Sequence, residues 1–389
     1  MSEVQRSGGL HVVVVGAGFV GVSLADALVR SGSRVTLVGD VGGMPEASAV
    51  SFGWLNSHRK RPDAYQALNR AGLQVWRDRL GPRHPEHVAW GGHTVVVADP
   101  DNVRALRARV AQLQALGYPA SIVPTHGAIA DLAIEPAQDA IAGHFPSEGH
   151  CAPLAIREAL IQDLRASGAC TFVADEATAV DHDGAMLRSG RRIAADRVVI
   201  AAGNGSAALA ESAGFALPLV PQHAGGAAWG LLASASAPRH GLDGVLSTDD
   251  LNLRPDGPDA LIAQCLDLDR HAGPEAVVDA ELEDQYADRI RRLLHRDDIA
   301  IEAVRIGHRV IPADGQTVAG PLDGTPDGRI WAVVTHSGIT LAPLLSETIA
   351  AELTARSLTP LLDDFRPTRF TQSGRPSSQV PAPSRPGEQ

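Results

Sequence analysis

The chain has 389 residues, of which 44% are hydrophobic and 20% charged, and its net charge is −11 at pH 7. This composition is typical of a globular protein, and the length predicts two domains or one domain with a large inserted layer. The negative charge argues against a nucleic-acid binder, because phosphate contacts need clustered basic residues. No segment approaches the roughly 18 apolar residues of a membrane helix and none resembles a signal peptide, so we expect no membrane span and a cytoplasmic location.

The three cysteines, Cys151, Cys170 and Cys265, lie far apart in the sequence. This spacing indicates neither a disulfide framework nor a paired-cysteine metal site. We therefore predict inert thiols and no metal site.

The first predicted elements are a strand, a helix and a second strand. Residues 10–18, LHVVVVGAG, are typical of a buried parallel strand, and residues 19–32 have helical apolar spacing that ends at Gly32. Residues 33–40 form another apolar strand, which completes a unit of about 30 residues.

A glycine motif of the form G-x-G-x-x-G joins the first strand to the helix. Gly16 permits the tight turn, Gly18 lets a pyrophosphate approach the backbone, and Gly21 lets helix and strand pack closely. The helix N-terminus supplies N–H groups and partial positive charge for the phosphates. Asp40, at the end of the second strand, is the candidate for holding the ribose hydroxyls.

The later elements are predicted from apolar periodicity and from glycine and proline boundaries. We expect helices at 63–80, 101–117, 153–168, 274–295 and 341–355, and strands at 86–98 (a pair with a glycine turn), 170–184, 196–203, 225–234, 259–268, 301–311 and 329–335. Between 118 and Glu148 the sequence is irregular, and the Ser- and Pro-rich tail after Phe370 predicts disorder.

NAD and FAD both use this glycine turn, and three further segments favour FAD. These are PEASAVSFGWLNS, ACTFVADEATAVDHDG with ADRVVIAAGNGS, and GHRVIPADGQTVAGPL with WAVVTHSGITLAPLLSETIAAEL. Together with the glycine turn, the chain resembles the FAD-dependent superfamily of D-amino acid oxidase, glycine oxidase and sarcosine oxidase. The resemblance implies an α/β fold, with a Rossmann-like FAD-binding domain interleaved with an antiparallel β-sheet substrate domain. The FAD is expected to be noncovalent, because no cysteine falls in the C-terminal segment.

On this resemblance the FAD-binding domain consists of residues 8–84, 148–222 and 312–370, and the substrate domain of 85–147 and 223–311. Residues 371–389 form the tail.

The resemblance also assigns cofactor contacts, segment by segment. The AMP half would contact Gly16, Gly18, Phe19, Val20, Gly21 and Asp40, the last because Gly39 stands where the family usually has Glu. Ser48 and Ala49 would lie at the pyrophosphate, Gly53, Trp54 and Leu55 at the isoalloxazine, Val180 at the adenine, and Ala202 and Gly203 where the backbone approaches the cofactor. Ser337, Gly338, Ile339 and Thr340 would open a helix that directs N–H groups at the pyrimidine carbonyl of the flavin.

Three residues are catalytic candidates. Arg309 occupies the position of the arginine that holds the substrate carboxylate in glycine oxidase-like members; a structural ion pair is the alternative. His336 is a candidate second substrate contact or a structural histidine. His58 and Lys60 follow the flavin loop, where a basic residue would assist oxygen activation or bind an acidic substrate, unless the run HRKRP is simply solvated.

The leading hypothesis is oxidation of the C–N bond of an amine or amino acid by hydride transfer to flavin N5, with oxygen or another molecule as electron acceptor. One alternative is an FAD-dependent 2-hydroxy acid dehydrogenase, in which His58 or His336 would serve as the base. A second alternative is a non-catalytic flavin-fold binding protein.

Overall fold

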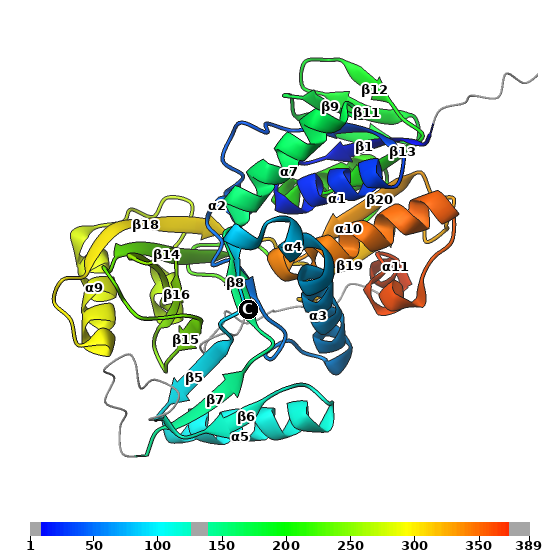
Figure 1. Ribbon diagram of the computed structural model, residues 1–389. Helices are drawn as coiled ribbons and strands as arrows, with labels where there is room; N and C mark the ends of the chain where they lie inside the picture. The colour runs from blue at the N-terminus through cyan, green and yellow to red at the C-terminus, as the bar shows by residue number, and fades with distance from the viewer. Residues whose placement is uncertain (1–8, 126–138, 373–389) are drawn as a thin grey trace, which may run out of the picture. The chain divides into compact units, whose positions relative to one another are not determined.

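A computed structural model describes residues 9–125 and 139–372 of the chain, and the predicted disordered tail lies almost wholly outside them (Figure 1). The described residues form two compact units. Unit 1 contains 9–48, 154–220 and 310–372, and unit 2 contains 49–125, 139–153 and 221–309. Each unit is assembled from separated segments of the chain, and residues 49–84 and 148–153, which the prediction assigned to the FAD-binding domain, belong to unit 2.

Unit 1 is built on a six-stranded sheet in the order β19-β20-β13-β1-β2-β9. Its strands are β1 (His11–Val15), β2 (Arg34–Val38), β9 (Cys170–Val173), β13 (Arg197–Ile200), β19 (Val318–Pro321) and β20 (Ile330–Val334). All neighbours pair in parallel except β19 with β20. The valines of β1 from Val12 to Val14 are fully buried, as expected for a parallel strand that is covered on both faces.

The helices of unit 1 agree closely with the apolar periodicity. They are α1 (Phe19–Arg30), α7 (Pro153–Ser167), α8 (Ser206–Ser212), α10 (Gly338–Ala355) and α11 (Arg369–Gln372), with short helices α2 (Glu46–Ala49), η4 (Gly203–Gly205) and η6 (Pro360–Phe365). Figure 1 shows α1 and α10 side by side, and the two helices are in extensive contact. Gly32 follows the end of α1 with a φ of +88°, which is the left-handed conformation of a helix C-terminus.

One predicted strand of unit 1 is divided. Residues 170–184 form β9 and then β10 (Ala177–Asp181), which joins β11 (Gly184–Leu187) and β12 (Arg192–Ala194) in a separate antiparallel sheet. The break falls at Asp175, whose N–H donates to the Val173 carbonyl and whose carboxylate accepts the N–H of Glu176. This local turn supplies hydrogen bonds that a continuous strand would have to replace.

Unit 2 is built on an eight-stranded sheet in the order β18-β14-β17-β16-β15-β5-β7-β6. Its strands are β5 (His93–Val97), β6 (Ser121–Val123), β7 (Ile141–Phe145), β14 (Trp229–Ser236), β15 (Val245–Ser247), β16 (Asn252–Pro255), β17 (Ala260–Gln264) and β18 (Ala300–His308). The sheet is antiparallel, as the resemblance implied, apart from the parallel pair of β15 and β5.

The predicted hairpin at 86–98 is wrong. β4 (Val88–Ala89) pairs with β8 (Gly149–Cys151), which also pairs with β3 (Trp54–Leu55), whereas β5 belongs to the large sheet. Gly91 lies between them, and a Cβ there would come 2.2 Å from the carbonyl oxygen of Asp243. The glycines therefore let the chain cross between two sheets at close approach instead of turning back on itself.

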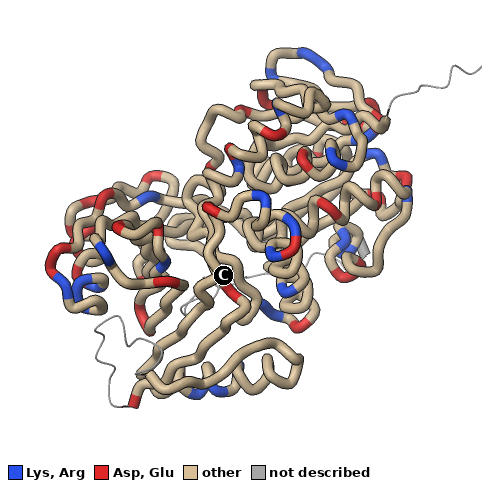
Figure 2. Tube along the Cα trace, in the orientation of Figure 1, with Lys and Arg blue, Asp and Glu red and all other residues tan. Residues whose placement is uncertain are grey.

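The helices of unit 2 cover its sheets. They are α3 (Asp63–Val75), continued by the π-helical turn η1 (Trp76–Leu80) and α4 (Gly81–Arg83), then η2 (Pro85–His87), α5 (Pro100–Ala115), η5 (Leu266–His271) and α9 (Ala280–Leu294). The apolar face of α9 packs on β14 and β18, while its outer face carries charges of both signs (Figure 2). Among the described helices, none has the length and apolarity needed to cross a bilayer.

Candidate active site

The glycine turn of unit 1 has the close contacts that a dinucleotide cradle needs. Gly16 has a φ of +115°, and a Cβ on it would lie 2.3 Å from the Ala201 carbonyl oxygen. A Cβ on Gly21 would lie 1.8 Å from the Gly16 carbonyl oxygen, so α1 packs directly on the turn. At Gly18, in contrast, a Cβ would meet nothing closer than the Ser48 hydroxyl at 3.5 Å. Gly16 and Gly21 are therefore fixed by packing, while Gly18 leaves the backbone open to a ligand.

Two helix N-termini meet at this edge of the sheet. α1 follows β1 and α10 follows β20, and these strands run in the same direction. A Cβ on Gly338 would lie 3.6 Å from Val20, and the N-cap residues of the two helices, Gly18 and Ser337, make no side-chain capping hydrogen bond. The partial positive charges of the two helices thus lie together, which suits an anionic group.

The end of β2 explains why glycine replaces the usual acid. Gly39 has a φ of +143°, and a Cβ there would lie 2.9 Å from Ala17, so a glutamate would be strained. The next residue, Asp40, is exposed, and its Oδ1 accepts the N–H of Gly42 at 2.9 Å. Asp40 is thus free to face a ligand, and its contact with ribose stays a prediction.

The remaining residues of unit 1 that were predicted to contact the cofactor differ in whether they already have partners within the protein. The Ser48 hydroxyl accepts the N–H of Phe19 at 3.1 Å, beside the glycine turn. Ala202 and Gly203 follow β13, and Gly203 has a φ of +57°. The N–H of Val180 donates to the Ser212 hydroxyl at 3.0 Å, and the Val180 side chain is buried. The structure therefore favours a packing role for Val180.

The loop predicted beside the isoalloxazine is packed within unit 2. Gly53 has a φ of +72°, and a Cβ there would lie 2.3 Å from the Cys151 carbonyl oxygen. Trp54 and Leu55 form β3 against β8 and are buried, whereas Ala49 is half-buried at the end of α2. Gly53 thus permits the approach to β8 that sets the position of Trp54.

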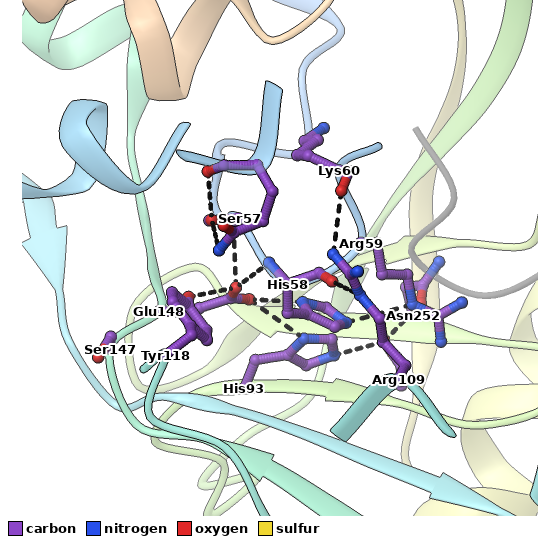
Figure 3. Close-up of polar contacts among 12 residues, drawn as sticks. Ser57, His58, Arg59, Lys60, His93, Arg109, Tyr118, Ser147, Glu148 and Asn252 are labelled. Atoms are coloured by element: carbon purple, nitrogen blue, oxygen red, sulfur yellow. Dashed lines mark hydrogen bonds and ion pairs between the residues drawn. The ribbon is translucent and has the colours of Figure 1, made fainter. Parts of the chain in front are cut away.

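A buried carboxylate fixes the segment that follows this loop (Figure 3). Glu148 Oε1 accepts the backbone N–H groups of Ser57 and His58 at 2.8 and 2.7 Å and the Tyr118 hydroxyl at 2.8 Å. Its Oε2 lies 2.9 Å from His58 Nδ1 and 3.5 Å from His93 Nδ1. Both histidines and Glu148 are at most 1% exposed. Their mutual contacts hold the pKa of Glu148 well below its usual range despite burial, so the group is a carboxylate.

The same three residues form a possible metal-ligand set, since one atom from each lies within 4.8 Å of the others. The Arg59 Nε–H donates to His58 Nε2 at 3.2 Å. Because that nitrogen must then carry a lone pair, the hydrogen bonds assign the proton to Nδ1, where it is donated to Glu148. In this tautomer His58 has no lone pair at Nδ1 for a metal ion. The cluster is therefore better described as a hydrogen-bonded carboxylate anchor.

Two residues of the basic run HRKRP, His58 and Lys60, are buried, whereas Arg61 and Pro62 are exposed. Burial lowers the pKa of His58 to about 3 and that of Lys60 to about 8, with Glu148 opposing both shifts. Lys60 is 5% exposed, and Arg109 donates to the carbonyl oxygens of both His58 and Lys60. His58, predicted as catalytic, is thus neutral, enclosed and engaged at both ring nitrogens, so this geometry favours a structural role.

Arg309 forms an ion pair inside unit 2. Its Nη2 donates to Asp269 Oδ2 at 2.6 Å, and its Nη1 donates to the carbonyl oxygens of Trp229 at 2.8 Å and Ala227 at 3.3 Å. The side chains of Arg309 and Asp269 are 12% and 10% exposed. Burial raises the pKa of Asp269, and Arg309 opposes that rise. The ion pair considered as the alternative for Arg309 is therefore present.

His336 lies in unit 1, half-buried between β20 and α10, and its contact with substrate stays a prediction. Ser337 is the N-cap residue of α10. The helix begins at Gly338, and Ile339 and Thr340 lie in its first turn, so this segment opens a helix as predicted.

The polar residues that sequence reasoning missed are Glu148, His93, Tyr118 and Asp269. Glu148 stands in PSEGH, which reads as a solvated turn, and Asp269 stands in LDLDRH beside the more exposed Asp267. No local pattern distinguishes these acids from surface acids, because their partners lie 30 to 91 residues away.

Comparisons with known proteins agree with this architecture. A family model described as FAD dependent oxidoreductase matches residues 11–352. The D-amino-acid oxidase of Bradyrhizobium diazoefficiens is 42% identical over 76 residues, which are 19% of this chain and 18% of that protein.

Solved structures share the fold at low identity. Glycine oxidase from Geobacillus kaustophilus is 20% identical with a TM-score of 0.77, covering 92% of this chain and 99% of its own. Iminodiacetate oxidase from Chelativorans sp. BNC1 is 16% identical with a TM-score of 0.75, covering 92% and 98%. L-proline dehydrogenase from P. horikoshii is 16% identical with a TM-score of 0.76, covering 95% and 99%. Together with the glycine cradle and the paired helix N-termini, the family match over nearly the whole chain shows that this protein belongs to the FAD-dependent oxidoreductases and that FAD is its cofactor.

Proposed function

We propose that the protein oxidises the C–N bond of an amine or amino acid. Bound FAD would supply the acceptor for the hydride that leaves the carbon beside the nitrogen. The nitrogen contributes its electron pair to a C=N bond and releases a proton, and water then hydrolyses the imine to a carbonyl compound and an amine or ammonia. Oxygen or another acceptor takes up the electron pair afterwards.

The observation that favours an amine is the state of His58, one of the two candidate bases for the hydroxy acid reaction; the other, His336, stays a candidate. Oxidation of a 2-hydroxy acid needs a base for the hydroxyl proton, whereas an amine that binds unprotonated needs none. His58 Nδ1 donates to Glu148 and Nε2 accepts from Arg59, so neither nitrogen is available to a substrate. The names of the three similar solved structures also refer to compounds that contain a C–N bond.

The chain's own residues would hold the cofactor as follows. The N-termini of α1 and α10 and the open backbone at Gly18 would bind its phosphates and stabilise negative charge. Asp40 would accept hydrogen bonds from ribose, and Glu148 would act only by fixing the segment after Trp54.

The test is anaerobic mixing of the yellow holoprotein with panels of amines, amino acids and 2-hydroxy acids. The proposal expects amines or amino acids to bleach the flavin absorption and to yield the carbonyl product. Bleaching by hydroxy acids alone would support the dehydrogenase alternative, and a colourless protein that binds no FAD would support the non-catalytic one. Hydrogen peroxide measured in air separates an oxidase from a dehydrogenase.

A further inference from the structure

Asp269 accepts a hydrogen bond from Arg309, the arginine that the family resemblance assigns to a substrate carboxylate. We propose that Asp269 closes Arg309 to carboxylates, and that the substrates are amines without a carboxylate on the reacting carbon. This inference rests on the proposed oxidation of a C–N bond.

The hydrogen bonds of Arg309 leave it poorly suited to hold a substrate. A bidentate grip on a carboxylate uses two neighbouring N–H groups of the guanidinium. Both hydrogens of Nη1 are directed at the Trp229 and Ala227 carbonyl oxygens, and Nη2 is bound to Asp269. Every pair of neighbouring nitrogens that includes Nη1 is therefore taken, and in the remaining pair, Nε and Nη2, the Nη2 group already donates to Asp269.

The charges lead to the same conclusion. Arg309 and Asp269 are one cation and one anion 2.6 Å apart, with side chains about nine-tenths buried. A second carboxylate at Arg309 would be attracted by the guanidinium and repelled by Asp269 at a comparable distance, so the two Coulomb energies would nearly cancel. The carboxylate would lose its hydration without a compensating charge, whereas an uncharged substituent would lose little.

The pair is built into the fold rather than formed by two mobile side chains. Asp269 lies in η5, and its Oδ1 accepts the N–H of Leu231 at 2.8 Å. Arg309 lies across Gly230, where a Cβ would come 2.1 Å from Nη2. Trp229 and His308 flank it as a cross-strand pair with rings stacked 4.1 Å apart. Both charges are thus held in place before any substrate arrives.

The experiment compares matched substrate pairs on the holoenzyme and its variants. Each pair is an amino acid and the amine that lacks its carboxylate: alanine with ethylamine, phenylalanine with phenethylamine, and proline with pyrrolidine. The measured quantity is the second-order rate constant for anaerobic bleaching of the flavin. We expect the wild type to favour the amine of a reactive pair at least tenfold, and Asp269→Asn to move that ratio towards the amino acid at least tenfold. The amide still accepts from Leu231 but carries no charge.

Asp267→Asn is the matched control. Asp267 lies in the same helix η5 and binds Arg289 through both oxygens at 2.6 and 2.7 Å, without contact to Arg309. Its variant should keep the wild-type ratio within twofold. A wild type that favours amino acids, or an Asp269→Asn ratio equal to that of the control, would overturn the inference.

A binding measurement keeps the test independent of turnover. Titration calorimetry with benzoate should give at least tenfold tighter binding to Asp269→Asn than to the wild type and the control, and equal binding by all three would overturn the inference. If no amine or amino acid bleaches the flavin, the proposed function fails and benzoate binding alone decides about Asp269. Asp269→Ser, which also keeps an acceptor for Leu231, replaces the asparagine variant if that one does not fold.

Discussion

The glycine turn of unit 1 and the Glu148 cluster of unit 2 both depend on contacts with the backbone, yet they are encoded differently in the sequence. Gly16, Gly18 and Gly21 lie within six residues of one another, and each is needed because a side chain would collide or block an approach. Glu148 gathers groups from Ser57 to Tyr118, up to 91 residues distant. The comparison teaches that contact with a cofactor can be recognised from local spacing, whereas a buried charge cannot.

The largest expected effect is on the free energy of unfolding, and it tests whether the Glu148 cluster is as important to the fold as the glycine turn. Glu148→Ala leaves two backbone N–H groups, the Tyr118 hydroxyl and His58 Nδ1 without their acceptor, so the free energy of unfolding should fall by about 3–5 kcal/mol. Urea unfolding monitored by tryptophan fluorescence measures it. Glu86→Ala, at an exposed acid of the same unit, should stay within about 0.5 kcal/mol. A loss below about 1 kcal/mol for the Glu148 variant would contradict the anchor.

The pH dependence sharpens the comparison, because buried neutral histidines occur in unit 2. Burial lowers the pKa of His150 from 6.5 to about 4, so between these values the folded protein binds fewer protons than the unfolded chain. The contribution of His150 to the free energy of unfolding is therefore complete above pH 6.5 and falls by about 1.4 kcal/mol per pH unit as the pH drops towards 4. The free energy of unfolding measured from pH 7 to 4 checks this. His150→Gln should lower the slope by one proton, and a slope equal to that of the wild type would contradict the assignment.

Within the turn, packing and cofactor contact can be separated. Gly21→Ala should cost about 1–3 kcal/mol of stability and also weaken FAD binding, because its Cβ meets the Gly16 carbonyl at 1.8 Å. Gly18→Ala should leave the apoprotein nearly as stable as the wild type, because its Cβ meets nothing closer than the Ser48 hydroxyl at 3.5 Å. It should still weaken FAD binding tenfold or more, because the added methyl group blocks the approach of the cofactor to the backbone. Flavin fluorescence titration and thermal unfolding of the apoprotein measure the two effects. Parallel losses in both variants would show that Gly18 serves packing alone.

The smallest expected effect concerns Asp40. If its carboxylate holds the ribose, Asp40→Asn should weaken FAD binding by about 1.5 kcal/mol or less, since one charge-assisted hydrogen bond becomes neutral. The same titration measures it, with Asp183→Asn, an exposed acid in the β10–β11 turn, as the control. Identical affinities for both variants would assign the ribose contact to the backbone.

Local signals in the sequence predict much of the fold, and the two wrong predictions have a common cause. Apolar runs locate β1, β2, β13 and β20, and their parallel pairing follows from the intervening helices. The predicted hairpin at 86–98 is wrong because the strands on either side of Gly91 pair with strands that are distant in the sequence. The predicted single strand at 170–184 is wrong because the turn at Asp175 separates two sheets.

The sequence by itself determined the glycine cradle, the order of the elements and, through the resemblance, the FAD-dependent family, because these depend on backbone requirements at fixed short spacing. Only the tertiary structure decided which polar residues are buried and paired. Asp269 neutralises Arg309, which is 40 residues away in the sequence. Glu148 accepts hydrogen bonds from the ring of His58 and from the backbone beside it, about 90 residues away. Desolvation and charge pairing depend on neighbours in space, and no short pattern in the chain records those neighbours.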